Sequence, residues 1–180
     1  MDMKPDDSAL AMRAGEGDAV AFRMLLERHY DGIFRTAYRL CGKREDAEDI
    51  AQDVCTGLVD RIGQFRGEAK FTTWLHRIVV NASRDHFRRQ SRVWRLDDDY
   101  VEILTGQGDA DAETRSNIAW LYQSLKQVGS DLRETAVLVL AMGYSHGEAA
   151  EIMSVKESTV SWRMHELRRK LKAKAEYENE

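Results

Sequence analysis

The chain has 180 residues, of which 32% are charged, and a formal net charge of −4 at pH 7, as expected of a soluble globular protein with one medium or two small helical domains. No apolar run approaches the length of a membrane span, and the N-terminus MDMKPDDSALAMR lacks the features of a signal peptide, so we expect a cytoplasmic protein without membrane insertion. The cysteines, Cys41 and Cys55, have no metal-ligand spacing, and no metal site or cofactor is predicted.

The first part of the chain has helical periodicity and no sustained strand pattern. A short helix is predicted within residues 6–14. Asp18 can cap a longer helix, and Gly42 stands where a left-handed C-terminal cap belongs. The apolar face of this longer helix consists of Phe22, Leu25, Leu26, Ile33, Ala37 and Leu40.

The next helix, predicted over residues 44–62, has one apolar and one acidic face. The residues expected to face the core are Ala47, Ile50, Val54 and Leu58. The outer face then consists of Asp46, Asp49, Gln52 and Asp53. By itself such a face is either a solvated surface or a docking site for a basic partner.

The segment from Phe65 to Arg95 joins a glycine-bearing aromatic turn to a third helix that begins near Phe71. Its predicted core side carries Leu75, Ile78, Val79 and Ala82. The opposite side presents a ring, cations and an amide, groups that stack on bases and hold phosphates. This stripe consists of Trp74, Arg77, Asn81, Arg84 and Arg88. We predict that it grips an opened nucleic-acid strand.

Periodicity is lost from Ser91 to about Ala112, where three consecutive aspartates and two glycines indicate a flexible linker. A second helical domain follows, with Ser130 or Asp131 as the cap of its second helix. Its helices are predicted over residues 114–128, 131–142, 145–153 and 157–174.

The last two helices have the proportions of a helix-turn-helix. Capping-box spacing of Ser145 with Glu148 and of Ser154 with Glu157 predicts where each begins. The stripe expected to be buried in the final helix is Val160, Met164, Leu167 and Leu171. The residues expected to face outward toward DNA are Ser158, Thr159, Ser161, Arg163 and His165, with Arg168 further along toward backbone or solvent.

Charge is segregated along the chain. Residues 43–60 and 96–117 are acidic, whereas 61–95 and 156–174 are basic. The acidic blocks oppose the phosphate field, so the chain is expected to bind free duplex DNA weakly and to read nucleic acid only with help.

Three segments in register resemble an extracytoplasmic-function (ECF) RNA polymerase sigma factor of the sigma-70 family. They are DAEDIAQDV at 46–54, FRGEAKFTTWLHRIVVNASRDHFRR at 65–89 and the C-terminal helix-turn-helix, and the resemblance covers about 18–171. It implies an all-α fold with region 2 at residues 1–91, a linker at 92–112 and region 4 at 113–180. Region 2 of the family binds core polymerase and melts the promoter −10 element, and region 4 reads the −35 element.

The resemblance also implies roles for particular residues. The docking surface for a basic coiled coil of bacterial core polymerase corresponds to Asp46, Asp49, Gln52 and Asp53. The −10 surface corresponds to Phe65, Arg66, Lys70, Phe71, Trp74, Arg77, Asn81, Arg84 and Arg88, among which Phe71 is equally compatible with packing. The −35 surface corresponds to Ser158, Thr159, Ser161, Arg163, His165 and Arg168.

Three positions of the final helix depart from the family pattern. Ser161 and Glu166 occupy places where many relatives carry basic residues, and glutamate accepts from cytosine but repels phosphate. Trp162 is bulky where a small residue is common. An unusual preference at the −35 element is therefore expected.

The expected partners are core RNA polymerase, promoter DNA and an anti-sigma factor, with a monomeric chain when free of them. The alternative is a helix-turn-helix regulator that binds duplex DNA as a dimer, which leaves the acidic helix and the basic turn without a role. An enzyme is not expected, because the scattered histidines form no metal-ligand or catalytic motif. They are His29, His76, His86, His146 and His165.

Overall fold

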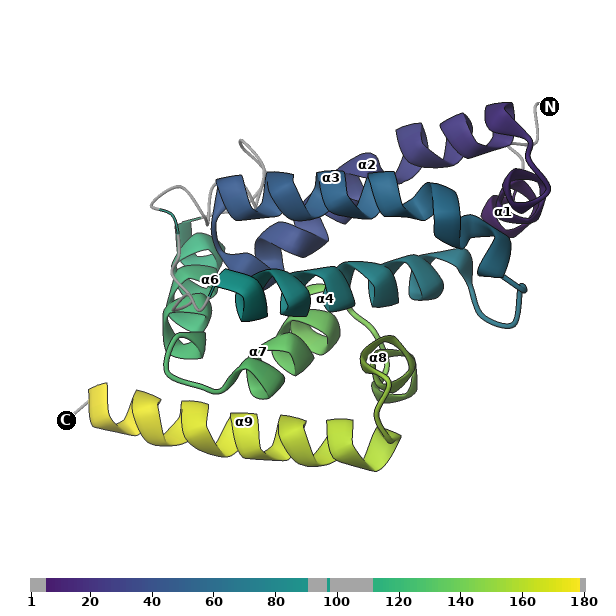
Figure 1. The fold of residues 1–180 in the computed structure, drawn as a ribbon. Helices are drawn as coiled ribbons and strands as arrows, with labels where there is room; N and C mark the ends of the chain where they lie inside the picture. Colours follow the sequence, from purple (N-terminus) through teal and green to yellow (C-terminus); the bar gives the residue numbers. More distant parts are fainter. Residues whose placement is uncertain (1–5, 91–96, 98–111, 179–180) are drawn as a thin grey trace. The chain divides into compact units, whose positions relative to one another are not determined.

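The chain folds into helices, as the sequence predicts. The computed structural model describes residues 6–90, 97 and 112–178, and within them every regular element is helical (Figure 1). The first elements are α1 (Asp7–Gly15), α2 (Ala19–Cys41), α3 (Arg44–Arg61), the 3₁₀ turn η1 (Ile62–Gln64) and α4 (Phe71–Gln90). The later ones are α6 (Ala112–Leu125), α7 (Ser130–Ala136), η2 (Val137–Ala141), α8 (His146–Met153) and α9 (Glu157–Glu178).

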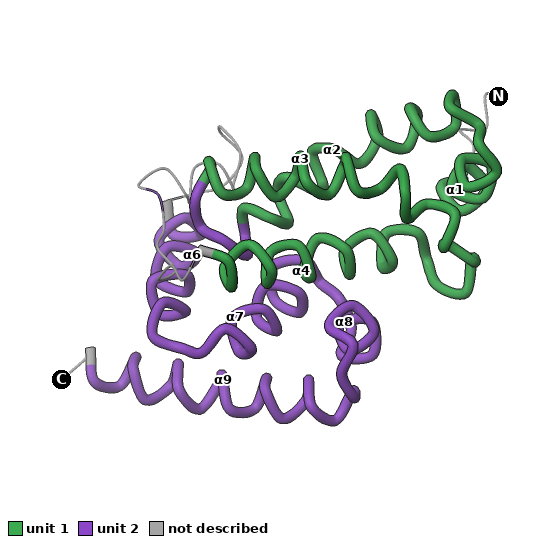
Figure 2. The backbone as a smooth tube through the Cα atoms, viewed as in Figure 1, with its two compact units in different colours: residues 1–38, 44–92 green, residues 39–43, 93–180 purple. Residues whose placement is uncertain are grey.

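The helices form two compact units (Figure 2). Unit 1 comprises residues 1–38 and 44–92, and unit 2 comprises 39–43 and 93–180. The predicted linker at 92–112 lies outside the described residues, except for Asp97 and the helical backbone of Ala112.

Local signals set the ends of α2. The Asp18 carboxylate accepts hydrogen bonds from the backbone N–H groups of Val20 and Ala21, both at 3.0 Å, and so caps the helix as predicted. The bond from Ala21, aided by the Arg13 side chain, holds the pKa of Asp18 below its ordinary value. At the other end Gly42 has φ +79°, which suits a residue without a side chain.

The core of unit 1 is formed by the inner faces of its three long helices. The side chains predicted to face inward from α3 are all buried, and α3 packs against α4 along its length. The buried side chains include Leu25 and Ile33 of α2, Ile50, Val54 and Leu58 of α3, and Leu75 and Val79 of α4. Burial of this many aliphatic groups fixes which faces of α3 and α4 remain outside.

In unit 2, one predicted capping box forms and the other does not. Ser145 and Glu148 bond each other's backbone N–H groups at 3.2 and 3.0 Å at the start of α8. Ser154, predicted to cap α9, is instead the C-cap of α8, with φ 57° in the left-handed region, so that prediction is wrong. Ser154 cannot also begin α9, because that helix begins only at Glu157, after the short turn that Ser154 opens.

The cap predicted for α7 is also wrong. Gly129, one residue earlier than expected, occupies the N-cap position and makes no side-chain cap. Ser130 is therefore already the first residue of the helix. The helix continues through the wider turn η2 and ends before Gly143, whose φ is +73°.

Candidate functional site

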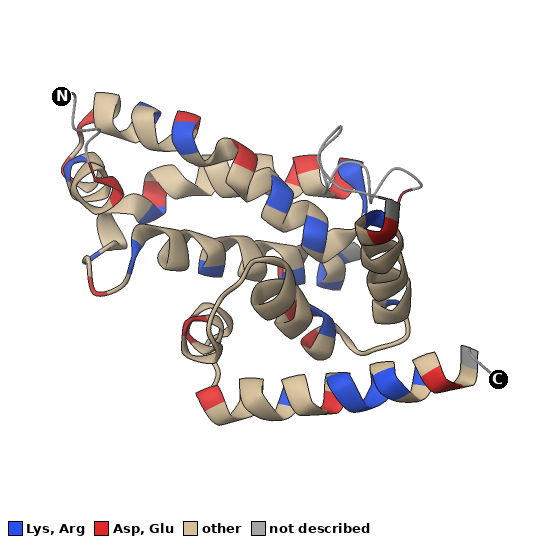
Figure 3. Ribbon diagram, turned by 180° about the vertical axis from the view of Figure 1, so that it is seen from behind, with Lys and Arg blue, Asp and Glu red and all other residues tan. Residues whose placement is uncertain are grey.

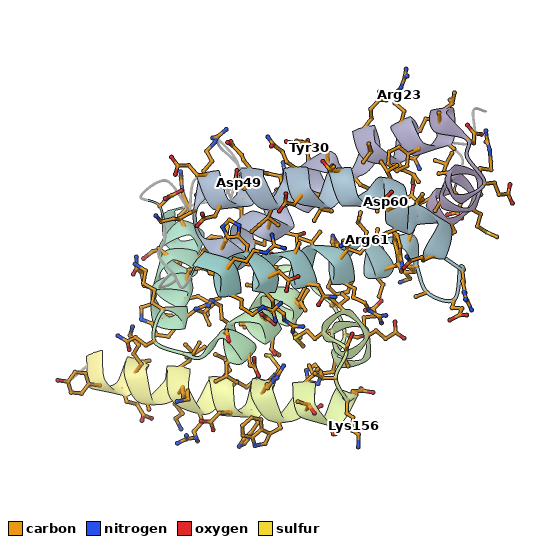
Figure 4. The ribbon with its side chains drawn as sticks, viewed as in Figure 1. Arg23, Tyr30, Asp49, Asp60, Arg61 and Lys156 are labelled. Carbon is orange, nitrogen blue, oxygen red and sulfur yellow. The ribbon has the colours of Figure 1, made fainter. Side chains whose placement is uncertain are left out.

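The acidic face of α3 borders a polar pocket in unit 1. Asp49, Gln52 and Asp53 are exposed, and together with His86 and Arg89 of α4 they line one open pocket. Figure 4 marks Asp49 in the N-terminal half of α3. The carboxylates of Asp49 and Asp53 lie at this open surface beside other side chains that can hydrogen-bond, so they are suited to bind a guanidinium or ammonium group of a partner.

Asp46, predicted to belong to the outer acidic face, does not lie there. It is 4% exposed and contacts Nε2 of His86 at 3.1 Å. The expectation that it faces outward is wrong because α4 supplies a buried polar partner for the third residue of α3. His86 continues the core stripe of α4 at a spacing of four from Ala82, and this spacing is the signal by which its burial could have been foreseen.

Replacement of Asp46 by alanine is expected to lower the free energy of unfolding of unit 1 by about 1–3 kcal/mol, because His86 loses its buried partner. Urea titration of the full chain followed by circular dichroism measures this change. The matched control is Asp49→Ala on the same helix, for which a change within about 0.5 kcal/mol is expected because Asp49 is exposed. Equal losses for both variants would contradict a structural role specific to Asp46.

The aromatic turn is closed by a cluster of rings. The ring centroid of Phe71 lies 5.6 Å from that of Phe65, 5.8 Å from that of Trp74 and 5.2 Å from that of His29. Phe65 and Phe71 are 7% and 2% exposed, so both rings pack within unit 1, which is the alternative that the sequence left open for Phe71. Trp74 is half-buried at the edge of the cluster, 5.5 Å from Phe65. Aromatic rings gain free energy when they pack against one another out of water, which accounts for the burial of this cluster.

The polar groups of this region remain on the outside. Arg66 and Lys70 are exposed in the loop before α4, and Gly67 has φ +73° between them. Along α4, Arg77 and Asn81 are exposed, as predicted for this stripe.

The C-terminal part of the stripe makes contacts with other side chains of α4. Arg84 is half-buried and donates to the Asn81 side-chain oxygen at 3.5 Å. Arg88 is exposed and forms an ion pair with Asp85, a residue to which the sequence analysis assigned no role. The structure thus brings cations and an amide together on one face of α4.

The predicted outer face of α9 is divided by the structure. Ser158, His165 and Arg168 are exposed, and Thr159 is half-buried. The hydroxyl of Ser161, although exposed, hydrogen-bonds Nδ1 of His146 at 2.9 Å, which ties α9 to α8.

Arg163 is turned toward the inside of unit 2. Its side chain is 11% exposed, forms an ion pair with Asp131 of α7 and contacts the sulfur of Met153 at 3.8 Å. The expectation that Arg163 faces outward is therefore wrong. The position follows the buried Val160 by three residues, so its side chain reaches back over the helix packing instead of outward.

Glu166 is held within α9. Arg169 donates to its two oxygens at 2.9 and 2.7 Å, and Lys170 lies 3.9 Å away. The hydrogen bonds from Arg169 hold the pKa of Glu166 below its ordinary value and raise that of Arg169. The negative charge expected to repel phosphate is thus balanced within the helix, and Lys and Arg gather on the C-terminal half of α9 (Figure 3).

The described residues contain neither a cluster of metal ligands nor a membrane-spanning helix. Among residues 6–90, 97 and 112–178, no three His, Cys, Asp or Glu side chains converge as metal ligands would. Cys41 is buried and Cys55 half-buried, and burial raises the pKa of the Cys55 thiol. Within the same described part of the chain, no helix combines the length and apolar character that crossing a bilayer requires.

Comparison with known proteins identifies several similar chains. Residues 25–93 match the family model of sigma-70 region 2. The ECF RNA polymerase sigma factor SigM of Mycobacterium tuberculosis is 33% identical over 167 residues, which cover 92% of this chain and 82% of that relative. The RNA polymerase sigma factor CnrH of Cupriavidus metallidurans is 27% identical over 190 residues, covering 99% and 100%.

A solved structure shows the same fold. The structure of CnrH in complex with the cytosolic domain of CnrY matches with a TM-score of 0.69 and 25% identity, over 95% of this chain and 97% of that chain. The similarity therefore extends over both units and is not limited to the helix-turn-helix.

Proposed function

The chain belongs to the ECF RNA polymerase sigma factors of the sigma-70 family, and we propose which of its residues carry out each step of transcription initiation. Unit 1 binds core polymerase and opens the −10 element, and unit 2 reads the −35 element as duplex. Residues 1–91, 92–112 and 113–180 serve as region 2, linker and region 4. The observation that carries the proposal is that α3 and α4 expose an acidic face and a cationic stripe while sharing one core.

Core polymerase docks on the acidic face of α3 in this proposal. Asp49, Gln52 and Asp53 supply two negative charges and an amide at an open pocket, which complements a basic helix of the partner. Asp46 contributes indirectly, by tying α3 to His86 of α4 beneath that face.

The −10 element is held by the polar side of the turn and of α4. Arg66 and Lys70 attract phosphates, and Arg77 and Asn81 meet the unpaired strand. Trp74 packs against Phe65 and is half-buried, and the part of its ring that remains exposed contacts a base. Phe65 and Phe71 serve by holding the loop in place.

The −35 element is read by α9. Ser158 and His165 are exposed near its N-terminal half and carry hydrogen-bonding groups for base edges, whereas Arg168 is placed for the phosphate backbone. Arg163 and Ser161 set the angle of α9 through Asp131 and His146.

An anti-sigma factor binds the chain and keeps it inactive until the chain is released. The support is that CnrH, a structural relative at 25% identity, was solved in complex with the cytosolic domain of CnrY. The acidic and basic surfaces of unit 1 would then be covered by such a partner. If the chain binds core polymerase equally well with and without the product of its neighbouring gene, that product is not the inhibitor.

Run-off transcription with purified core polymerase tests the proposed function. We expect transcripts from promoters that include the factor's own upstream region, and only when both the chain and core polymerase are present. A conventional regulator is not favoured, because it uses unit 2 alone. Specific binding of duplex DNA by the chain without polymerase, together with no transcript from any tested promoter, would overturn the sigma-factor role. The chemistry of RNA synthesis belongs to the polymerase.

A further inference from the structure

The aromatic side chain of Trp162 is exposed on the helix assigned to the −35 element. It is 63% exposed, whereas Val160 and Met164 on either side of it are 0% and 1% exposed. An indole left in water forgoes the burial that large aromatic groups normally gain. This position therefore contributes little to the packing of unit 2.

Trp162 lies on the outer face of α9, near the N-terminal end of the helix. Ser158 precedes it by four residues and His165 follows it by three, and both are exposed, so the three side chains share one face. The helix begins at Glu157, which places Trp162 in the second turn, the part of a recognition helix that meets base edges. Figure 4 marks Lys156 at the turn that leads into this end.

The neighbouring charges favour DNA as the occupant of this face. Lys and Arg gather further along α9, and Glu166 is neutralised by Arg169. A strongly basic helix with an exposed apolar ring near its N-terminal end suits a duplex, whose phosphates meet the cations while its major groove receives the ring.

The major groove has one apolar feature that an indole can recognise. Each base edge there presents hydrogen-bonding groups, and only thymine adds a methyl group, which apolar side chains contact. We propose that Trp162 is a specificity-determining residue that covers a thymine methyl group in the −35 element, with Ser158 and His165 bonding to adjacent base edges. The proposal rests on the function proposed above for unit 2.

The test removes the methyl group and the indole separately. DNA retained by the wild-type holoenzyme from a library randomised across the −35 region defines the preferred element. Each thymidine of that element is then replaced by deoxyuridine, and promoter binding by holoenzyme is measured. We expect one replacement to weaken wild-type binding about fourfold, which corresponds to the ~0.8 kcal/mol of one buried methyl-sized group. Trp162→Ala holoenzyme is expected to bind thymidine and deoxyuridine promoters equally.

The matched control is Tyr177→Ala, which removes an 82% exposed ring from the far end of the same helix and is expected to keep the full methyl dependence. The assignment of Trp162 is overturned if the loss of binding on replacing thymidine by deoxyuridine is unchanged in Trp162→Ala. It is also overturned if wild-type holoenzyme shows no such loss at any thymine. Failure to recover any preferred −35 sequence with wild-type holoenzyme would instead count against the proposed function of unit 2, so the two failures are distinguishable. Circular dichroism of the full chain verifies that each variant is folded.

Discussion

Replacement of both Asp49 and Asp53 by lysine is expected to abolish binding to core polymerase while unit 1 stays folded. Both carboxylates are exposed, so the core of α3, which consists of residues such as Ile50 and Val54, is untouched. Each substitution turns an attraction toward a basic partner into a repulsion. Like charges placed against each other at an interface cost several kcal/mol, so the affinity is expected to fall by about two orders of magnitude or more.

Co-purification and a competition titration against the wild-type chain measure this loss. The matched control is Glu27→Lys with Asp31→Lys, which has the same spacing of four and the same charge change on exposed positions of α2. Retained binding is expected for this control. Equal loss in the two double variants would mean that net charge, and not the face of α3, governs docking.

Replacement of Arg77 and Asn81 by alanine is expected to leave polymerase binding intact and to reduce promoter opening by about tenfold or more. The two exposed side chains supply one phosphate-binding cation and one amide that can bond a base, and a good side-chain contact to a base is worth about 1–3 kcal/mol. They are better targets than Trp74, because truncation of Trp74 also disturbs its packing on Phe65 and Phe71.

Permanganate reactivity of promoter thymines reports opening, and co-purification with core polymerase reports polymerase binding. The control is Arg23→Ala with Arg35→Ala, which removes more positive charge than the test variant but from exposed positions of α2; Figure 4 marks Arg23. Normal opening is expected in this control. Undiminished reactivity in the Arg77 and Asn81 variant would show that the stripe on α4 serves no purpose in strand separation.

Periodicity predicted the helices and most of the buried faces because burial of an amphipathic helix depends chiefly on spacing along its own sequence. Ile50, Val54 and Leu58 illustrate this, since each lies in the core where the pattern places it. Start signals were equally local for Asp18 and for the Ser145 capping box.

The predictions of side-chain orientation that failed depend on partners distant in sequence. Asp46 and Arg163 both fit an outward polar pattern, yet each is engaged by a side chain of another helix, His86 in one case and Asp131 in the other. The pattern of one helix gives no sign of such contacts, because the packing of two helices decides which polar side chains meet. For Phe71 the sequence left packing and base contact equally open, because a ring suited to stacking on a base is equally suited to packing against Phe65.

The division of α9 into an anchored side and a free side bears on how such factors diversify. Arg163 holds the helix to α7 from one side, while Ser158, Trp162 and His165 project from the other side, next to Ser161, whose hydroxyl bonds His146 of α8. Substitutions on the free side change no buried contact, so they carry little penalty in folding. A duplicated copy of this gene can therefore acquire a new set of target promoters by drift at a few surface codons, and the same codons are the ones to randomise when building orthogonal gene circuits.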